Sequence, residues 1–411
     1  MSDGDDRRPR VELPILDARF KATTHALYDR LRDRGHGLVA IRLPSGIEAW
    51  LVTSYAASRM LLNDARLSKD AWHLQAAPEA LAGAPVDASH PLFRHLLTMD
   101  PPEHTRLRTI IAREFSSRRV ELLRPRIRDI AAALLDDIAP DTSGDLMKIF
   151  ALPLPLRVIC ELIGIPAEDA PRIADWSERL TTADLDGSDR AWSIADDIHA
   201  YLLNLAERKC AVPDRSLFAG LVAAHDAGEL TASELTAMAF LLVSAGHETS
   251  ANLIGNGVLT LLRRPSLWAA LVAEPDLAPA FVDELLRLES PLEVATARFA
   301  TADIPVGDVV IRKGDRVFVG LAAANRDPTQ FDRPEELDTD RAPSNHHLAF
   351  GHGVHYCIGA TLARAEGEIA LVELSRRYPG LALAVEPDEL EWAPGLIMRG
   401  LQRLPVRWRS R

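Results

Sequence analysis

A ten-residue stretch near the C-terminus constrains the possible folds of this chain more than any other. Residues 350–359 read Phe-Gly-His-Gly-Val-His-Tyr-Cys-Ile-Gly, and an apolar run with helical spacing follows at once. We expect Gly351, Gly353 and Gly359 to let the backbone adopt positive φ angles and approach a flat or bulky group. Cys357 falls where that helix begins, and the free backbone N–H groups there favour an anion such as a thiolate.

A thiolate at Cys357 would be a metal ligand or a nucleophile. We interpret the two other cysteines, Cys160 and Cys210, as small buried hydrophobic residues. Three cysteines provide no disulfide framework for a chain of 411 residues, which favours a reducing, cytoplasmic compartment.

Two other kinds of site also combine a cysteine with histidines. A zinc-binding module would draw its further ligands from the nearby histidines, which are His346, His347, His352 and His355. The paired Cys-X2-Cys or His-X3-His spacing of structural zinc sites is missing, however. A cysteine hydrolase would use Cys357 as nucleophile and a histidine as base, but it leaves the motifs described below without a role.

The composition indicates one large globular domain. No Gly/Ser-rich or Pro-rich linker and no repeat interrupts the chain, so we expect a polar tail at residues 1–10 and a single domain over residues 11–411. The formal net charge of −12 argues against a nucleic-acid partner. The acidic N-terminus lacks the apolar core of a signal peptide. The longest apolar run, residues 237–243, is far shorter than the roughly 20 residues that span a bilayer, so we expect no membrane segment.

The longest helical pattern begins at Thr231, which forms a capping box with Glu234, and ends before Pro265. About 30 residues at 1.5 Å each predict a rod of roughly 45 Å that crosses the whole domain. Its middle reads Ala-Gly-His-Glu-Thr-Ser at residues 245–250. A glycine inside a helix costs about 1 kcal/mol relative to alanine, so Gly246 needs a reason. One possible reason is that two helices pack closely at this glycine. The other is that the glycine forms a notch in the helix beside an acid and a hydroxyl group.

Two further motifs lie on predicted helices. Two prolines open a helix near residue 101, and His104 and Arg108 share one face of it because they are four residues apart. Glu284 and Arg287 form an i,i+3 pair on another helix.

The remaining elements are predicted from periodicity and turn signals. They are a hairpin at residues 38–52, helices at 55–62, 120–138 and 155–164, two helices within 167–209 around a polar loop at 182–189, strands at 308–311 and 316–319, and C-terminal strands within 381–406. Residues 69–91 lack a steady period, and we expect a long loop that walls or covers a site.

The Phe-Gly-X-Gly-X-His-X-Cys-X-Gly pattern of residues 350–359 resembles the haem-binding loop of the cytochrome P450 family. The Ala-Gly-X-Glu-Thr, His-X3-Arg and Glu-X-X-Arg motifs extend the resemblance over most of the chain. It implies a mainly α fold with small β-sheets, a triangular prism of helices with haem between a long central helix and the helix that follows the cysteine loop. The implied activity is a haem-thiolate monooxygenase that hydroxylates or epoxidises an organic substrate with O2.

The resemblance also implies roles for individual residues. Cys357 is the axial ligand of the iron of haem b, and His104, Arg108, Arg298 and His355 hold the haem propionates. Further contacts to the cofactor are expected from Ala245, Gly246, Thr249, Phe350, Gly351 and Gly359. The notch at Ala245 and Gly246 makes room for dioxygen, Thr249 hydrogen-bonds to it, and Glu248 relays protons.

The expected substrate pocket is lined by side chains from three segments, namely Leu242, Val243, Ala245, Val294, Ala295 and Ile397. Glu284 and Arg287 are implied to form a buried structural ion pair behind the haem loop. Relatives often add an arginine after a Pro-X pair, but Pro334-Glu335 is followed here by Glu336. Arg333 or Arg341 is the candidate substitute.

Nothing in the chain resembles a flavin or nicotinamide domain, so electrons are expected from a ferredoxin fed by a ferredoxin reductase. The resemblance places Arg106, Arg113 and Arg364 near the Cys357 side, where they would form a basic docking patch; scattered, solvated arginines are the alternative. The subgroup resemblance favours a bulky, mostly apolar secondary metabolite such as a macrolide, another polyketide or a sterol-like molecule. A terpenoid, a fatty acid or an aromatic compound remains the alternative substrate.

Overall fold

The computed structural model describes residues 10–17, 19–33, 37–70, 90–113, 115–139, 142–186, 190–212, 214–341 and 346–409. Most of the polar tail expected at residues 1–10 and most of the loop expected at residues 69–91 lie outside these described residues.

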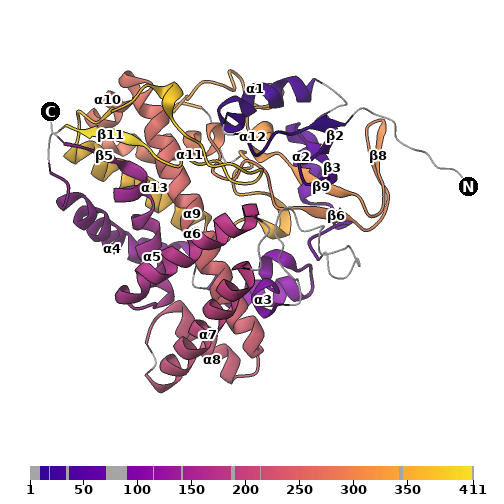
Figure 1. Ribbon diagram of the computed structural model, residues 1–411, viewed down its shortest axis with the longest axis horizontal. Coiled ribbons are helices and arrows are strands. Elements are labelled where there is room, and N and C mark those ends of the chain that lie inside the picture. Colours follow the sequence, from indigo (N-terminus) through magenta and orange to yellow (C-terminus); the bar gives the residue numbers. More distant parts are fainter. Residues whose placement is uncertain are drawn as a thin grey trace, which may run out of the picture.

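Helices dominate the structure (Figure 1). They are α1 (Phe20–Arg32), α2 (Tyr55–Leu62), α3 (Glu103–Ala112), α4 (Ser117–Asp136), α5 (Pro153–Ile163), α6 (Ala170–Asp186), α7 (Arg190–Ala211), α8 (Leu217–Asp226), α9 (Ala232–Leu262), α10 (Pro265–Ala273), α11 (Ala278–Leu288), α12 (Leu321–Ala324) and α13 (Ala360–Arg377). The predicted mainly α fold is therefore confirmed. Residues 182–186 of the polar loop expected at residues 182–189 are helical, because α6 continues to Asp186, and residues 187–189 lie outside the described residues.

The strands form small sheets. They are β1 (Val11–Glu12), β2 (Leu38–Arg42), β3 (Glu48–Val52), β4 (Leu67–Ser68), β5 (Thr142–Asp145), β6 (Arg298–Ala300), β7 (Ile304–Val306), β8 (Val309–Ile311), β9 (Arg316–Val319), β10 (Ala382–Leu383) and β11 (Pro405–Trp408). The largest sheet has the order β1-β2-β3-β9-β6-β4, and the predicted hairpin at residues 38–52 is its β2–β3 pair. Figure 1 shows this sheet on one side of the molecule and most helices on the other.

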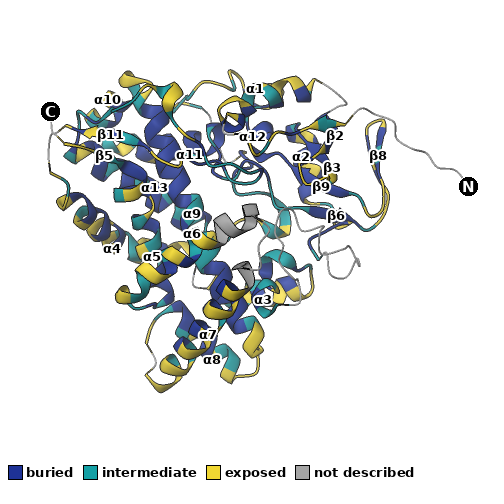
Figure 2. Cartoon of the chain, in the orientation of Figure 1, coloured by how far each residue is buried: buried dark blue, intermediate teal, exposed yellow. Residues whose placement is uncertain are grey.

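Helix α9 is the centre of the helical part. Thr231 and Glu234 form the predicted capping box at its N-terminus, and it packs against α5, α7, α8, α10, α11 and α13. Residues 235–242 and 250–261 are all buried (Figure 2). Between them, within residues 243–249, His247 is the one buried side chain. A core helix that loses burial over two turns at its midpoint borders an internal opening there.

A buried ion-pair network holds α11 against the segment that leads to the cysteine loop. Arg287 is fully buried and donates two hydrogen bonds to Glu284, Nε to Oε1 at 2.8 Å and Nη2 to Oε2 at 3.0 Å. Arg341 donates to the same carboxylate at 3.1 Å. Burial alone would raise the pKa of Glu284, but hydrogen bonds from Arg287 and the Asp338 amide and the charge of Arg341 hold it below its usual value.

Arg341 therefore completes the network, and the alternative candidate, Arg333, does not. Arg333 is exposed and pairs instead with Glu336 and Asp338. Arg287 also donates to the carbonyl oxygen of Glu336 at 2.7 Å, so the backbone of this segment supplies acceptors to the network as well.

The burial of Cys160 and Cys210 tests their interpretation from the sequence. Cys160 is buried, as predicted, and burial raises the pKa of its thiol to about 12, which makes it unreactive. Cys210 is exposed near the end of α7, so its interpretation as a buried hydrophobic residue was wrong. Among the described residues, no helix is long and apolar enough to cross a membrane.

Replacing Arg287 by alanine is expected to lower the free energy of unfolding by about 3–5 kcal/mol, because it leaves the Glu284 carboxylate buried and without its principal partner. Arg312→Ala is the control: Arg312 is paired with Asp303 at 2.7 Å on the surface, and its loss should change stability little. Urea unfolding of both variants measures the difference. Equal stability of the two variants would contradict a structural role for the buried pair.

Candidate active site

The cysteine loop is held by backbone geometry that only glycine tolerates at two positions. Gly351 and Gly353 have φ angles of 74° and 75°. A Cβ on Gly353 would also lie 2.9 Å from Asn63 Oδ1 and 3.0 Å from the Leu62 carbonyl oxygen at the end of α2. Gly359 does not fit the prediction, because its φ of −85° is ordinary and it serves as the N-cap of α13.

Cys357 lies three residues before the first residue of α13. Its backbone N–H donates to the Phe350 carbonyl oxygen at 2.9 Å, which closes the loop. The side chain is accessible, yet burial raises the pKa of its thiol against the opposing effects of the Gly359 amide and the charges of Arg108 and Arg364. Cys357 is thus exposed while its thiol is desolvated, so a group that binds against this loop could reach the sulfur.

Four predicted contact residues gather beside this loop. The rings of His104 and His355 lie 4.4 Å apart between centroids, and Arg108 Nη2 donates to the Tyr356 carbonyl oxygen at 2.8 Å. Arg298 on β6 donates to the Leu62 carbonyl oxygen at 3.1 Å, the same group that crowds Gly353. The end of α2 thus connects the sheet to the cysteine loop.

Lys69 is a further basic side chain of this group, and sequence reasoning missed it. The β4–β6 register pairs Ser68 with Phe299, which brings Lys69 to Arg298. The Lys69 ammonium is buried and donates to the Thr296 carbonyl oxygen at 3.2 Å. Burial, followed by the charge of Arg298, holds the pKa of Lys69 well below its usual value. No local sequence signal marks Lys69, because its approach to Arg298 depends on the β4–β6 register.

These buried donors lack enough acceptors. Among the described residues, the two ring nitrogens of His104, Nε of Arg298 and Nε2 of His355 have no hydrogen-bond partner. Burial lowers the pKa of Arg298 to about 10, and burial with the charges of His355 and Arg108 lowers that of His104 to about 4. Buried donors without acceptors are costly, so the set fits an anionic group such as a carboxylate.

The opening on α9 is formed by the predicted motif. Ala245 is exposed in the middle of this core helix, and Glu248 and Thr249 are partly exposed. Thr249 Oγ1 donates to the Ala245 carbonyl oxygen at 3.0 Å. Burial raises the pKa of Glu248 above that of an exposed glutamate.

Gly246 has the packing role that we kept as the alternative. A Cβ at this position would lie 3.0 Å from Cδ1 and Cγ1 of Ile159, so α5 approaches α9 closely here. Ala245, and not Gly246, is the small residue that borders the opening.

The predicted substrate wall is only partly reproduced. Val294 is fully buried in a hydrophobic cluster with Leu13, Tyr28 and Phe318, so its side chain packs against the sheet, and the prediction that it lines a pocket was wrong. Its neighbour Ala295 is partly exposed. Neither residue lies in a strand, so no alternation pattern in the sequence could separate the two side chains.

The remaining residues predicted to line the substrate pocket also differ in burial. Val243 and Ile397 are partly exposed, whereas Leu242 belongs to the main core cluster. The Ile397 carbonyl oxygen accepts from the Glu293 amide at 2.8 Å, which fixes the predicted C-terminal turn beside this segment.

The zinc-module alternative fails on geometry. No group of three histidine, cysteine or acidic side chains in the described part of the chain is arranged to hold a metal ion. His347 is instead buried near Asp283, with 3.7 Å between Nε2 and Oδ1.

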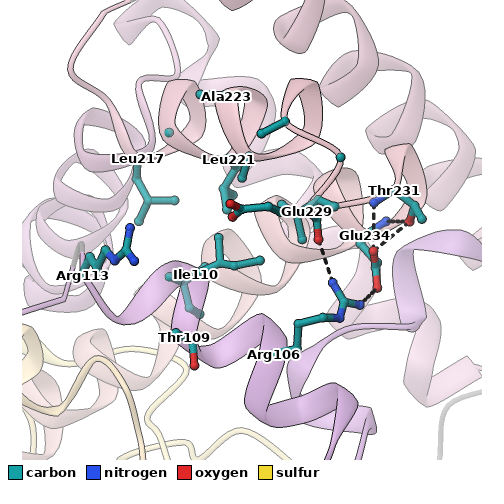
Figure 3. Close-up of a pocket in the computed structure, with 16 residues that line it drawn as sticks. Arg106, Thr109, Ile110, Arg113, Leu217, Leu221, Ala223, Glu229, Thr231 and Glu234 are labelled. Carbon is teal, nitrogen blue, oxygen red and sulfur yellow. Dashed lines mark hydrogen bonds and ion pairs between the residues drawn. The ribbon is translucent and has the colours of Figure 1, made fainter.

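The predicted basic docking patch is largely neutralised within the chain. Arg106 donates to Glu103, Glu234 and the Glu229 carbonyl oxygen at the edge of a separate cleft of about 920 Å³ between α3, α8 and the start of α9 (Figure 3). Arg364 donates to Asp283 at 2.7 Å and stacks on Phe350. Of the three, Arg113 is the exposed one for which the structure shows no carboxylate partner among the described residues.

Comparison with known proteins decides the family. The cytochrome P450 family profile matches residues 159–382. The chain is 42% identical over 405 residues to cytochrome P450 monooxygenase PikC of Streptomyces venezuelae, covering 98% of this chain and 95% of that one. It is 40% identical over 373 residues to mycinamicin IV hydroxylase/epoxidase of Micromonospora griseorubida, covering 90% and 91%. The chain belongs to the cytochrome P450 family. It is a cytochrome P450 monooxygenase, and the family implies a haem-thiolate cofactor.

A solved structure extends the match to the whole P450 fold. The tirandamycin C-bound P450 monooxygenase TamI superimposes with a TM-score of 0.88 at 41% identity, covering 97% of this chain and 100% of that one. The exposed sulfur of Cys357 and the donors around it fit the thiolate and carboxylate contacts that such a cofactor requires.

One buried acid of this P450 was not anticipated. Glu366 on α13 is 1% exposed, and neither carboxyl oxygen has a hydrogen-bond partner among the described residues. Burial raises the pKa of Glu366 to about 8. The hydroxyl of Ser250, which follows Thr249 on α9, acts in the opposite direction and lowers this pKa. Glu366 is therefore protonated near neutral pH at the interface between the two helices that carry the site.

The folded-state pKa of Glu366 lies above that of an unfolded glutamate, so the folded protein keeps a proton that the unfolded chain releases between these two values. The free energy of unfolding should therefore fall as pH rises from 5 to 7, by up to about 1.4 kcal/mol per pH unit. Glu366→Gln should remove this contribution and gain stability relative to the wild type at pH 7, in urea unfolding at both pH values. Glu368→Gln, whose partner is Arg124, is the control. If the wild type and Glu366→Gln differed in free energy of unfolding by the same amount at both pH values, a protonated Glu366 would be contradicted.

Proposed function

We propose that this P450 binds haem b through the Cys357 thiolate and inserts one atom of dioxygen into a bulky, mostly apolar secondary metabolite, by hydroxylation or epoxidation. The observation that carries the proposal is the accessible, desolvated sulfur of Cys357 beside a set of buried donors without acceptors.

The residues that would hold the cofactor follow from the donor set. Cys357 supplies the thiolate, and the Gly359 amide and the charges of Arg108 and Arg364 stabilise the anionic sulfur. His104, Arg108, Arg298 and His355 are the donors for the haem carboxylates, to which we add Lys69. When bound, a haem with a thiolate ligand supplies the electron density that favours O–O cleavage.

The chain's own contribution is to orient the substrate and deliver protons. Ala245 leaves space on α9, Thr249 presents a hydroxyl there, and Glu248 is a desolvated acid one residue away. A carboxyl group with a raised pKa holds its proton more firmly than an exposed one and can serve as a proton donor and acceptor. The partly exposed side chains of Val243, Ala295 and Ile397 would form the apolar surroundings of the substrate.

The substrate class rests on the relatives. The names of two of them refer to mycinamicin IV and tirandamycin C, and we infer a macrolide or another polyketide for this chain as well. We also infer a ferredoxin and its reductase as electron donors. The cysteine loop exposes Val354 and Tyr356 on the surface, which offers an apolar contact for such a donor.

Cys357→Ala should abolish the strongly red-shifted Soret band of the reduced protein under CO, because that band reports thiolate-ligated haem. Cys210→Ala, at the exposed cysteine, should keep it. Absorbance spectra of both variants, with haem content measured separately, provide the comparison. A wild-type protein without haem, or an alanine variant with the unchanged band, would refute the proposal.

Thr249→Ala should retain haem and substrate binding but divert severalfold more reducing equivalents to hydrogen peroxide, because it removes the hydroxyl at the opening on α9. Thr236→Ala is the matched control, since Thr236 makes the same kind of bond to its own helix, Oγ1 to the Ala232 carbonyl oxygen, but is fully buried. Peroxide formed per NADPH is measured with a surrogate ferredoxin and reductase. The substrate would come from a spectral-shift screen of macrolides, steroids and terpenoids. Unchanged coupling would exclude Thr249 from proton delivery.

A further inference from the structure

His247 is the one residue of the Ala-Gly-His-Glu-Thr motif to which neither the family motif nor the proposed chemistry gives a role. It lies on α9 between Gly246 and Glu248, and it is buried although the residues on both sides of it are not. Its side chain therefore points away from the opening that Ala245 and Thr249 border.

Both ring nitrogens of His247 are engaged. Nδ1 lies 2.8 Å from the Val243 carbonyl oxygen, one turn earlier on α9. Nε2 lies 2.9 Å from Oγ of Ser177, which belongs to α6 and is 70 residues away in sequence. The second contact joins two helices and the first fixes the ring.

The two contacts together define the hydrogen positions. A carbonyl oxygen only accepts, so Nδ1 carries the proton and donates to Val243. Burial lowers the pKa of His247 and keeps the ring neutral, so Nε2 is an acceptor. The Ser177 hydroxyl must then donate to Nε2. This arrangement is directional, and a side chain that merely fills the space cannot reproduce it.

The hydrogen bond between Ser177 and His247 joins α6 to the middle of α9. Helix α6 crosses in front of α9 in Figure 1 and is continuous to Asp186. The bond reaches α9 at the residue between the close α5 contact at Gly246 and the acid Glu248. Any movement of α6 away from α9 must break it.

We propose that His247 is a positioning residue. The hydrogen bond that it accepts from Ser177 holds α6 against α9 beside Glu248 and Thr249. This bond limits how fast a ligand dissociates from the site at Cys357. The proposal rests on the proposed haem-thiolate function, because the ligand in question is one that occupies the haem side of α9.

The test uses the haem-loaded full-length protein and 4-phenylimidazole, an azole that ligates haem iron from the substrate side. Its dissociation rate constant is measured by stopped-flow absorbance in the wild type, Ser177→Ala, His247→Phe and the double variant. Each single variant should dissociate the azole about fivefold faster, the factor that corresponds to one net hydrogen bond. The double variant should be no faster than either, because both changes remove the same bond.

Two controls separate this role from general loosening of the helix. Ser177→Thr keeps the hydroxyl and should keep the wild-type rate. Asp175→Asn alters the exposed face of the same helix and should have no effect.

The outcomes are distinct. A Ser177→Ala rate within twofold of the wild type, or single-variant effects that multiply in the double variant, would overturn the proposal while leaving haem-thiolate chemistry intact. A wild-type protein without the CO spectrum would overturn the proposed function and this inference together.

Discussion

The burial of α9 is the constraint on which the rest of the structure depends. A helix of 31 residues crosses the helical part of the molecule and packs against helices on all sides, so its side chains contribute much of the apolar area removed from water. Close packing leaves few voids in such a core. An interruption of burial at residues 243–249 therefore persists only because the helices packed against α9 are held at fixed positions around it.

Buried polar interactions help to hold the elements around the cysteine loop in position. Glu284, Arg287 and Arg341 fix the chain behind the cysteine loop, and the Leu62 carbonyl oxygen connects Arg298 to the crowded Gly353. Each of these groups is buried or glycine-dependent, so the arrangement tolerates little displacement. The site is thereby held rigidly before any ligand enters, which is the condition under which a few oriented groups act effectively on a substrate.

The sequence allowed the fold and the centre of the site to be predicted because their signals are local. The loop around Cys357, the capping box at Thr231 and the Glu284–Arg287 spacing each depend on residues within a few turns of one another. Contacts between distant segments were not accessible in this way. Lys69 reaches Arg298 only through the β4–β6 register, and Arg341 was one of two candidates until its distance to Glu284 was known.

The same limit explains the errors. Val294 and Ala295 are adjacent in sequence but differ in burial, and because neither lies in a strand, no alternation rule could separate them. The sequence also does not show which charged side chains are paired within the protein. Arg106 and Arg364 were predicted to offer positive charge to a partner, but both donate hydrogen bonds to carboxylates of their own chain. A glycine at residue 246 was open to two explanations, and the position of Ile159 favours packing.

The like-charged pair of Lys69 and Arg298 has a consequence for how the protein matures. Both side chains are buried, Asp100 is the acid that offsets their charges, and Arg298 retains a donor without an acceptor among the described residues. A nascent chain that has not yet captured its anionic prosthetic group must enclose this excess of positive charge, whereas a loaded one does not. Binding to the folded state alone then raises stability by mass action. The cellular supply of that prosthetic group would therefore govern how much newly made protein escapes proteolysis, as well as how much of it is active.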